Sequence, residues 1–342
     1  MQRSPRSHRA FVSTMPCVLP DDLPWMAFLD AASAAAGGAD ALALILRDSW
    51  ECSADPGKIP SDARAVLLVE VQQAAIDDRL AATASGVYRL DEHGLADLKL
   101  RPGATLDPAM ATAASVYLPI ILGSARARRA GESFVAGHVT QTLDGRIACE
   151  NGQSQWIGND ADLRHSHRMR ALLDAVMVGA NTALQDDPQL DVRHVPGPDP
   201  RRVVISGRAR ALSAAADLKI LQEPGCEVFV GAEAQVTGPM GAARIHRIAE
   251  SGGALDPAAV LRALRAQDVH SIYLEGGAGV LSSFLEAGAI DVLQVHVASL
   301  VLGSGLPSLT LPVVEHVDHG LHVHMDHAIL DGHVLLTCRP RA

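Results

Sequence analysis

The sequence has few aromatic residues and no closely spaced cysteines. Phe, Trp and Tyr make up 3% of its 342 residues while 48% are hydrophobic, so aliphatic side chains must fill most of the core. No two of the five cysteines form a Cys-x-x-Cys pair; they stand at positions 17, 52, 149, 226 and 338. This spacing argues against a disulfide framework and a structural zinc site, and it fits a reducing cytoplasm.

A basic surface and an N-terminal apolar run are also missing. The formal net charge is −10 and no basic patch dominates, which argues against a nucleic-acid-binding surface. An anionic substrate must therefore be met by a few placed arginines. The N-terminal segment contains arginines but no apolar stretch long enough for a signal peptide or a membrane span, so we expect a cytoplasmic protein without membrane contact.

The length of the chain predicts more than one domain, because 342 residues exceed one typical domain. We predict a flexible tail over residues 1–20, an α/β domain of unknown role over 21–130 and a second domain over 131–342. Within the first domain we expect a helix at 25–36 and another at 72–84. Strands are expected at 41–46, 65–71 and near residues 87 and 98, and residues 124–132 (SARARRAGE) are expected to form a basic linker.

Residues 133–193 hold most of the chemically unusual side chains. An alternating apolar run from Phe134 predicts a strand, and Asn159 followed by acidic residues predicts the cap of a helix. Met169, Leu172, Leu173 and Val176 lie three and four apart, so we expect them to be buried while Arg164 and Arg170 project elsewhere. Polar residues follow the next strand, 175–178, at the end where open α/β sheets bind ligands.

A glycine-rich turn forms the second functional element. A strand at 271–274 is followed by Glu275-Gly276-Gly277-Ala278-Gly279 and then by a helix at 280–287. Glycines at this place let backbone N–H groups approach a phosphate, although such a turn also serves tight packing. Strands alternate with helices up to this point, which predicts a mainly parallel sheet. We expect the last strands, at 292–298, 321–325 and 328–337, to pair antiparallel.

Four motifs occur in a recognisable order: TLDGRIA, GQSQWI, HRMRALLDAVMVGANTALQDDPQLDVR and YLEGGAGVLSSFLEAGAIDVL. Together they resemble the reductase domain of riboflavin biosynthesis, which follows the deaminase in the bifunctional deaminase-reductase, over about residues 131–340. The resemblance implies a dihydrofolate-reductase-like α/β fold, NADPH as cofactor and a homodimer. It also implies reduction of the ribosyl group of a phosphoribosylamino-pyrimidine to ribityl. The deaminase zinc signature, His-Ala-Glu with Pro-Cys-x-x-Cys, is absent from residues 21–130, so we expect no deaminase activity.

The same resemblance implies roles for individual residues. The substrate-binding set is Ser154, Arg170, Leu190, Arg193 and Glu275. The cofactor-binding set is Trp156, Thr182, Asp186, Gly276, Gly277, Ala278 and Gly279. Asp144, expected beside the nicotinamide, and Glu275 are the catalytic candidates. In addition, Arg208 and Arg210 follow a strand and are placed to meet the 2′-phosphate of NADPH.

Each role has a plain structural alternative. Arginines are most often solvated, Trp156 is a natural core residue, Asp144 fits an Asp-Gly turn, and Glu275 fits an acid that stabilises the next helix. The histidines at 316, 319, 322, 324, 327 and 333 suggest a metal site, but His322 and His324 are explained as the polar face of a strand, so we predict no metal.

The predicted activity is that of an NADPH-dependent oxidoreductase of the 5-amino-6-(5-phosphoribosylamino)uracil reductase type. Arg170 and Arg193 favour a phosphorylated substrate, because a guanidinium fork suits a phosphate. Two alternatives stay open: a reductase of the same fold acting on another heterocycle, such as a pterin or a specialised-metabolite intermediate, and a non-catalytic NADPH-binding module.

Overall fold

A computed structural model describes most of the chain. The described residues are 19, 25–46, 50–57, 63, 65–70, 76, 81–82, 84–90, 96–104 and 106–341, apart from 216, 223, 239, 252 and 253. The predicted tail and most of the predicted helix at 72–84 lie outside them.

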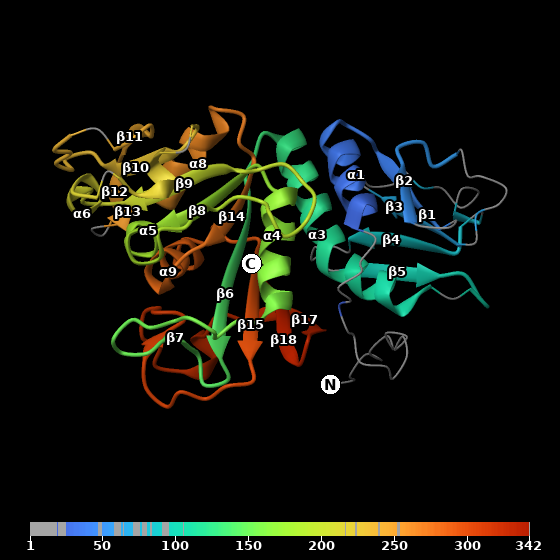
Figure 1. The fold of residues 1–342 in the computed structure, drawn as a ribbon. Coiled ribbons are helices and arrows are strands. Elements are labelled where there is room, and N and C mark those ends of the chain that lie inside the picture. The colour runs from blue at the N-terminus through green and yellow to red at the C-terminus, as the bar shows by residue number, and fades with distance from the viewer. Residues whose placement is uncertain are drawn as a thin grey trace.

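In the described residues, the N-terminal part forms a five-stranded sheet with two helices on its inner side (Figure 1). Helix α1 (Trp25–Ala36) precedes β1 (Ala41–Leu46), β2 (Trp50–Ser53), β3 (Ala65–Glu70), β4 (Gly86–Leu90) and β5 (Ala96–Leu100), and the strand order is β2-β1-β3-β4-β5. The helix and four of the strands were predicted, whereas β2 was not. Its four residues, WECS, alternate too briefly to give a strand signal.

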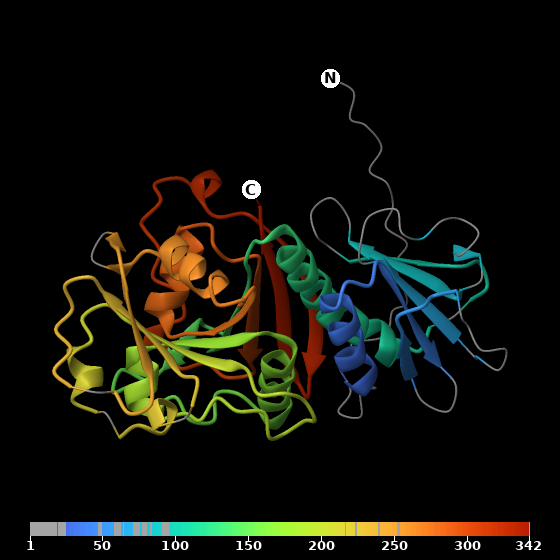
Figure 2. The same cartoon turned by 90° about the horizontal axis from the view of Figure 1, so that it is seen from above.

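Helix α3 (Pro108–Ala130) lies between the five-stranded sheet and a larger, nine-stranded sheet (Figure 2). Asp107 caps it by accepting a hydrogen bond from Ala109 N at 2.8 Å, and Gly131 ends it with φ +68°. The prediction of a linker at 124–132 was wrong. Basic residues also stabilise the last turn of a helix, and here Arg128 pairs with Asp174 at 2.8 Å.

By length and composition α3 could cross a membrane, but its environment is that of a core helix. Of its most apolar stretch 67% is buried inside the protein. It packs closely on the larger sheet at Gly123, where an added Cβ would lie 2.3 Å from the ring of Phe134. A glycine is therefore required at this contact.

The larger sheet has nine strands in the order β11-β10-β9-β8-β14-β6-β15-β18-β17 (Figure 1). From β11 to β15 all neighbours pair parallel, and β15, β18 and β17 pair antiparallel. This confirms the predicted mainly parallel α/β sheet. The bounds are β6 (Phe134–Thr142), β8 (Ala175–Gly179), β9 (Arg201–Ser206), β10 (Glu227–Gly231), β11 (Arg244–Ile248), β14 (Ser271–Glu275), β15 (Val292–Ala298), β17 (Val323–Leu330) and β18 (His333–Pro340).

Short elements complete the larger part. The helices are α4 (Asp160–Leu172), α5 (Ala180–Asp186), α6 (Arg210–Ser213), α7 (Lys219–Gln222), α8 (Pro257–Arg265), α9 (Ala278–Glu286) and the 3-10 turn η1 (Val317–His319). Two small ribbons pair β7 (Arg146–Ala148) with β16 (Leu306–Pro307), and β12 (Glu250–Ser251) with β13 (Ala254–Leu255). The domain limits at 20 and 130 stay a prediction.

Helix α4 is buried on more sides than its sequence indicates. Asn159 caps it as predicted, accepting from Asp162 N at 2.9 Å. The expectation that Arg170 projects away from the core was wrong, since Arg170 is buried together with Asp162, His165, Ser166, His167 and Arg168. One side of α4 faces the larger sheet, and α1 and α3 cover another side (Figure 2). Its polar residues therefore need partners within the protein.

The C-terminal hairpin corrects two predicted strands. The turn falls at Asp331-Gly332, both with positive φ (47° and 80°), so β17 ends at Leu330 and β18 begins at His333. An Asp-Gly pair is a strong hairpin signal, which the predicted strand at 328–337 overran. His322 precedes β17, so it does not share the face of that strand with His324, and Met325 is exposed.

Candidate active site

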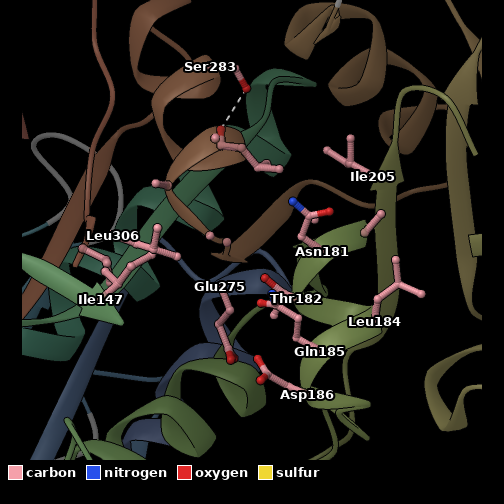
Figure 3. Close-up of a pocket in the computed structure, with 18 of the residues that line it drawn as sticks. Ile147, Asn181, Thr182, Leu184, Gln185, Asp186, Ile205, Glu275, Ser283 and Leu306 are labelled. Atoms are coloured by element: carbon pink, nitrogen blue, oxygen red, sulfur yellow. Dashed lines mark hydrogen bonds between the residues drawn. The ribbon is translucent and has the colours of Figure 1, made fainter. Parts of the chain in front are cut away.

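A cavity of about 1010 Å³ opens at the carboxyl ends of β6, β8, β9 and β14 (Figure 3). Its position is the one at which open α/β sheets bind ligands. The side chains of Glu275, Thr182 and Asp186 point into it (Figure 3). Of the residues predicted from the sequence, those lining it are Ser154, Thr182, Asp186, Glu275, Gly276, Gly277, Ala278 and Gly279, and Arg208 lines it as well. The side chain of Arg210 lies outside the described residues.

The glycine turn leads directly from β14 into α9. Gly277 is the N-cap of α9 and supplies no side-chain hydrogen bond, so the first N–H groups of the helix are not capped by a side chain. A Cβ added at Gly279 would meet no atom within 4 Å, and one added at Gly277 would meet only Thr182 Oγ1 at 3.5 Å. The turn therefore leaves room for a ligand phosphate against the helix N-terminus.

Glu275 and Arg170 form a bidentate ion pair on the wall of the cavity. Arg170 Nε lies 2.6 Å from Glu275 Oε1 and Nη2 lies 2.7 Å from Oε2, while Nη1 donates to Asp191 O at 3.2 Å. Burial opposes the charge on Arg170, but the Glu275 carboxylate raises the pKa of the guanidinium. Arg170 itself does not line the cavity, but it holds in place the Glu275 carboxylate that does.

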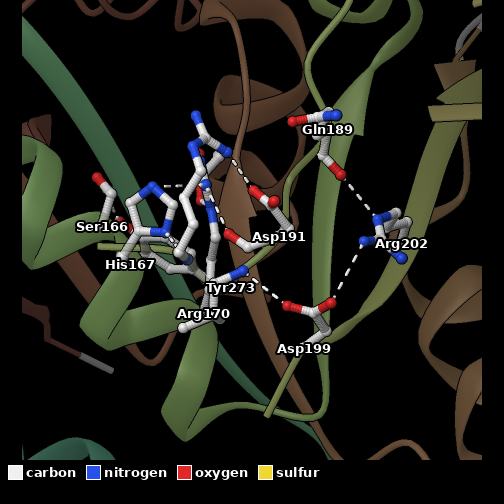
Figure 4. A network of polar contacts seen from close by, with 11 residues as sticks. Ser166, His167, Arg170, Gln189, Asp191, Asp199, Arg202 and Tyr273 are labelled. Atoms are coloured by element: carbon white, nitrogen blue, oxygen red, sulfur yellow. Dashed lines mark hydrogen bonds and ion pairs between the residues drawn. The ribbon is translucent and has the colours of Figure 1, made fainter. Parts of the chain in front are cut away.

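A loop over residues 187–200 carries Arg193 and is fixed by hydrogen bonds to its backbone (Figure 4). Arg193 N donates to His167 Nδ1 at 3.2 Å, and Arg202 Nε donates to Gln189 O at 2.7 Å. The Arg193 side chain is half exposed, pairs with Asp191 and does not line the cavity. Leu190 is buried, with φ +54°.

Leu190 does not line the cavity, and two more predicted site residues also stand apart from it. Trp156 is 89% exposed and does not line it. Asp144 accepts hydrogen bonds from Thr142 Oγ1 at 2.6 Å, Leu302 N at 3.1 Å and Gly303 N at 2.7 Å. The Thr142 hydroxyl and then these backbone N–H groups hold the pKa of Asp144 at about 2. This geometry favours the alternative in which Asp144 is a turn residue, here tying the turn to the chain at 302–303.

The comparisons with known proteins agree with this geometry. The family model of the RibD C-terminal domain matches residues 133–326, more than half of the chain. The chain belongs to this family. A 2,5-diamino-6-ribosylamino-4(3H)-pyrimidinone 5′-phosphate reductase of Methanothermobacter thermautotrophicus is 33% identical over 192 residues, which cover 54% of this chain and 86% of that protein.

Members of the family also match the N-terminal part. The riboflavin biosynthesis protein RibD of Mycobacterium tuberculosis is 29% identical over 297 residues, covering 85% of this chain and 76% of that protein. RibD of Acinetobacter baumannii superposes with a TM-score of 0.58 at 20% identity over 93% of this chain and 99% of its own. A Thermotoga maritima deaminase/5-amino-6-(5-phosphoribosylamino)uracil reductase gives 0.57 at 20% identity, with the same coverage. Over 93% of its length the chain thus shares their fold.

Sequence reasoning missed a buried polar cluster that reaches the cavity wall at His138 and Thr140. Asp162 Oδ1 lies 3.3 Å from His138 Nε2 and 3.1 Å from His296 Nδ1, and His296 Nε2 lies 2.8 Å from His333 Nδ1. Burial alone would raise the pKa of Asp162, but the two imidazoles and the Thr140 hydroxyl hold it well below its usual range. These residues come from β6, α4, β15 and β18, so only the register of the sheet shows that they meet.

The buried histidines predict acid sensitivity. Burial, more than any neighbouring charge, lowers the pKa of His296 from 6.5 to about 4. Burial is also the main cause that lowers the pKa of His167 to about 4. The unfolded chain then binds protons that the folded chain does not, so stability falls as the pH falls from about 6.5 to about 4. For His296 the effect is on the order of 3 kcal/mol.

A His296→Gln variant, which keeps a polar side chain without titrating in this range, should therefore lose less stability than the parent over this interval. Urea unfolding at pH 7.5 and pH 4.5 measures the difference, with the exposed His327→Gln as the matched control. Equal losses for parent and His296→Gln would contradict the assignment.

Proposed function

We propose that this chain is an NADPH-dependent reductase that converts the ribosyl group of a 5-amino-6-(5-phosphoribosylamino)uracil-type pyrimidine to ribityl in riboflavin biosynthesis. The observation that carries the proposal is one continuous cavity lined by both the glycine turn of α9 and the Glu275 carboxylate. A site that transfers a hydride from a dinucleotide to a sugar needs a place for the dinucleotide phosphates and a polar group that orients the sugar. Family membership and the reductase name of the Methanothermobacter relative support the same reaction.

The residues at the glycine turn fit a phosphorylated dinucleotide. Backbone N–H groups at Gly277 to Gly279 would hold the pyrophosphate at the positive end of the helix dipole. Thr182 and Asp186 of α5 line the same wall, and Arg208 is placed to pair with a 2′-phosphate, which favours NADPH over NADH. When bound, NADPH supplies the hydride that reduces the anomeric carbon.

The remaining lining residues position the substrate. Glu275, fixed by Arg170, accepts hydrogen bonds from ribose hydroxyls or from the pyrimidine. Ser154 contributes a hydroxyl to the cavity lining, and Arg193, which is half exposed on the 187–200 loop and outside this lining, is assigned to the substrate phosphate. The protein thus contributes orientation and electrostatics, and water can supply the proton that completes the reduction.

NADPH oxidation, followed as loss of absorbance, tests the function. We expect turnover with the deaminated phosphoribosylamino-pyrimidine, with NADPH preferred over NADH. The non-deaminated form, run in parallel, tests the reaction named for the Methanothermobacter relative. NADPH binding without turnover of either form would contradict the proposal and favour another heterocycle, such as a pterin. Stoichiometric binding with no turnover of any heterocycle would favour a non-catalytic module.

A Gly279→Val variant tests the cofactor site. The added side chain meets no protein atom at its Cβ, so the fold should be kept, but it enters the space assigned to the pyrophosphate. We expect the Kd for NADPH to rise by tenfold or more, roughly the loss of one charge-assisted hydrogen bond, with little change in Tm. Gly238→Val, at a glycine with open space outside the cavity lining, is the control. Equal Kd values for both variants would contradict the site.

We further propose a cytoplasmic homodimer. Among the described residues, nine of the thirteen exposed large apolar side chains fall within residues 300–325, including Val313 at 96% and Val317 at 93%. Such a concentration on one segment is typical of an interface. Light scattering should give about twice the chain mass of 35.9 kDa, and Val313→Asp with Val317→Asp should halve it. A parent mass of one chain at micromolar concentration would contradict the dimer.

A further inference from the structure

The structure assigns a role to the N-terminal part. We propose that Trp25 of α1 and Tyr117 of α3 are positioning residues, which hold the 187–200 loop and helix α4 so that Arg193 stays in place for the phosphorylated end of the substrate. This inference rests on the proposed function. It gives a use to a segment that has the fold of deaminase-reductase proteins but lacks the deaminase zinc signature.

The first contact ties α1 to the loop. Trp25 is 6% exposed, and its indole Nε1 donates to Pro196 O at 2.7 Å. A buried indole N–H needs a partner, and this one is a backbone carbonyl three residues after Arg193. The bond is directional and joins two parts of the chain that are 171 residues apart.

The loop is wedged between α1 and α4 just beyond that bond. Gly197 has φ +151°, and a Cβ added there would lie 2.5 Å from Ala171 Cβ on α4 and 3.6 Å from Leu29 Cδ2 on α1. No side chain fits at this position without a shift of α4. At Gly197 the 187–200 loop therefore passes between α1 and α4.

Tyr117 contacts α4, the helix that packs against the loop at Gly197. Its hydroxyl, fully buried, lies 3.1 Å from His165 Nδ1 on α4 and accepts from Arg168 Nη1 at 3.5 Å. The Tyr117 ring packs edge-on against Trp25, with 5.5 Å between centroids. The two N-terminal aromatics thus form one unit.

The support continues from α4 to the arginines. Two residues after His165, the His167 imidazole accepts the hydrogen bond from Arg193 N at 3.2 Å (Figure 4). One turn further on, Arg170 donates to Asp191 O at 3.2 Å. The loop backbone is consequently held from α1 at Pro196 and from α4 at Arg193 and Asp191. If the Trp25 hydrogen bond is lost, α4 still holds the loop at Asp191 and Arg193, but α1 no longer holds it at Pro196.

Trp25→Phe tests the proposal, because it removes the indole N–H while keeping an aromatic ring. In the full-length protein we expect amide hydrogen exchange over residues 189–197 to become at least about three times faster. The KM for the phosphoribosylamino-pyrimidine should rise about three- to tenfold, with kcat and the KM for NADPH within about twofold of the parent. Met26→Ala, at a 54% exposed position of the same helix, should change none of these quantities.

A double-mutant cycle separates positioning from general loss of packing. If Trp25 acts through Arg193, Trp25→Phe should have no further effect on this KM in the Arg193→Ala background. Fully additive effects on KM would overturn the proposal, and so would unchanged exchange over 189–197. The exchange measurement requires no turnover. A parent protein that fails to reduce the pyrimidine therefore refutes the proposed function alone, while exchange still decides whether Trp25 holds the loop.

Discussion

The ion pair between Arg170 and Glu275 is the contact on which the rest of the site depends. It joins the last turn of α4 to the end of β14, with both nitrogen–oxygen distances at 2.6–2.7 Å. Glu275 is followed at once by the glycine turn, so the pair also fixes where α9 begins. Because a partly buried charge is costly without its partner, neither residue can change alone without disturbing the cavity wall. One contact thus holds both the Glu275 carboxylate and the start of the glycine turn on the cavity wall.

The sequence was sufficient for the parts of the site that are local. The turn at 275–279 lies between a clear strand and a clear helix, and its residues line the cavity as a continuous segment. The cap at Asn159 was likewise predicted from neighbouring residues. Arg170 was predicted as a ligand contact, but its partner is 105 residues away. An amphipathic pattern predicts that a charged residue faces solvent. The residues near Arg170 in the sequence do not indicate that a distant carboxylate would let it be buried.

The register of the sheet explains the other misses. His138 on β6 lies between Glu275 on β14 and Gln294 on β15, and Thr140 lies beside His296 two residues along. The buried cluster around Asp162 follows from that alignment, which requires knowing the strand order and every offset between strands. A one-residue shift would move each of these side chains to the other face of the sheet. The pattern of the single strands therefore predicts a sheet but not the polar network within it.

The N-terminal part is best understood from what it covers. His165 and Arg168 are buried on α4, and both contact the Tyr117 hydroxyl of α3. If α1 and α3 were absent, His165 and Arg168 would lose the Tyr117 hydroxyl, and the carbonyl of Pro196 would lose the Trp25 indole. The apolar side chains packed beside them would meet water. A fold can lose the residues for zinc chemistry at little cost to stability when those residues are few and local. It cannot lose the helices that complete the core of its neighbour, which is a physical reason for this architecture to persist without the zinc signature.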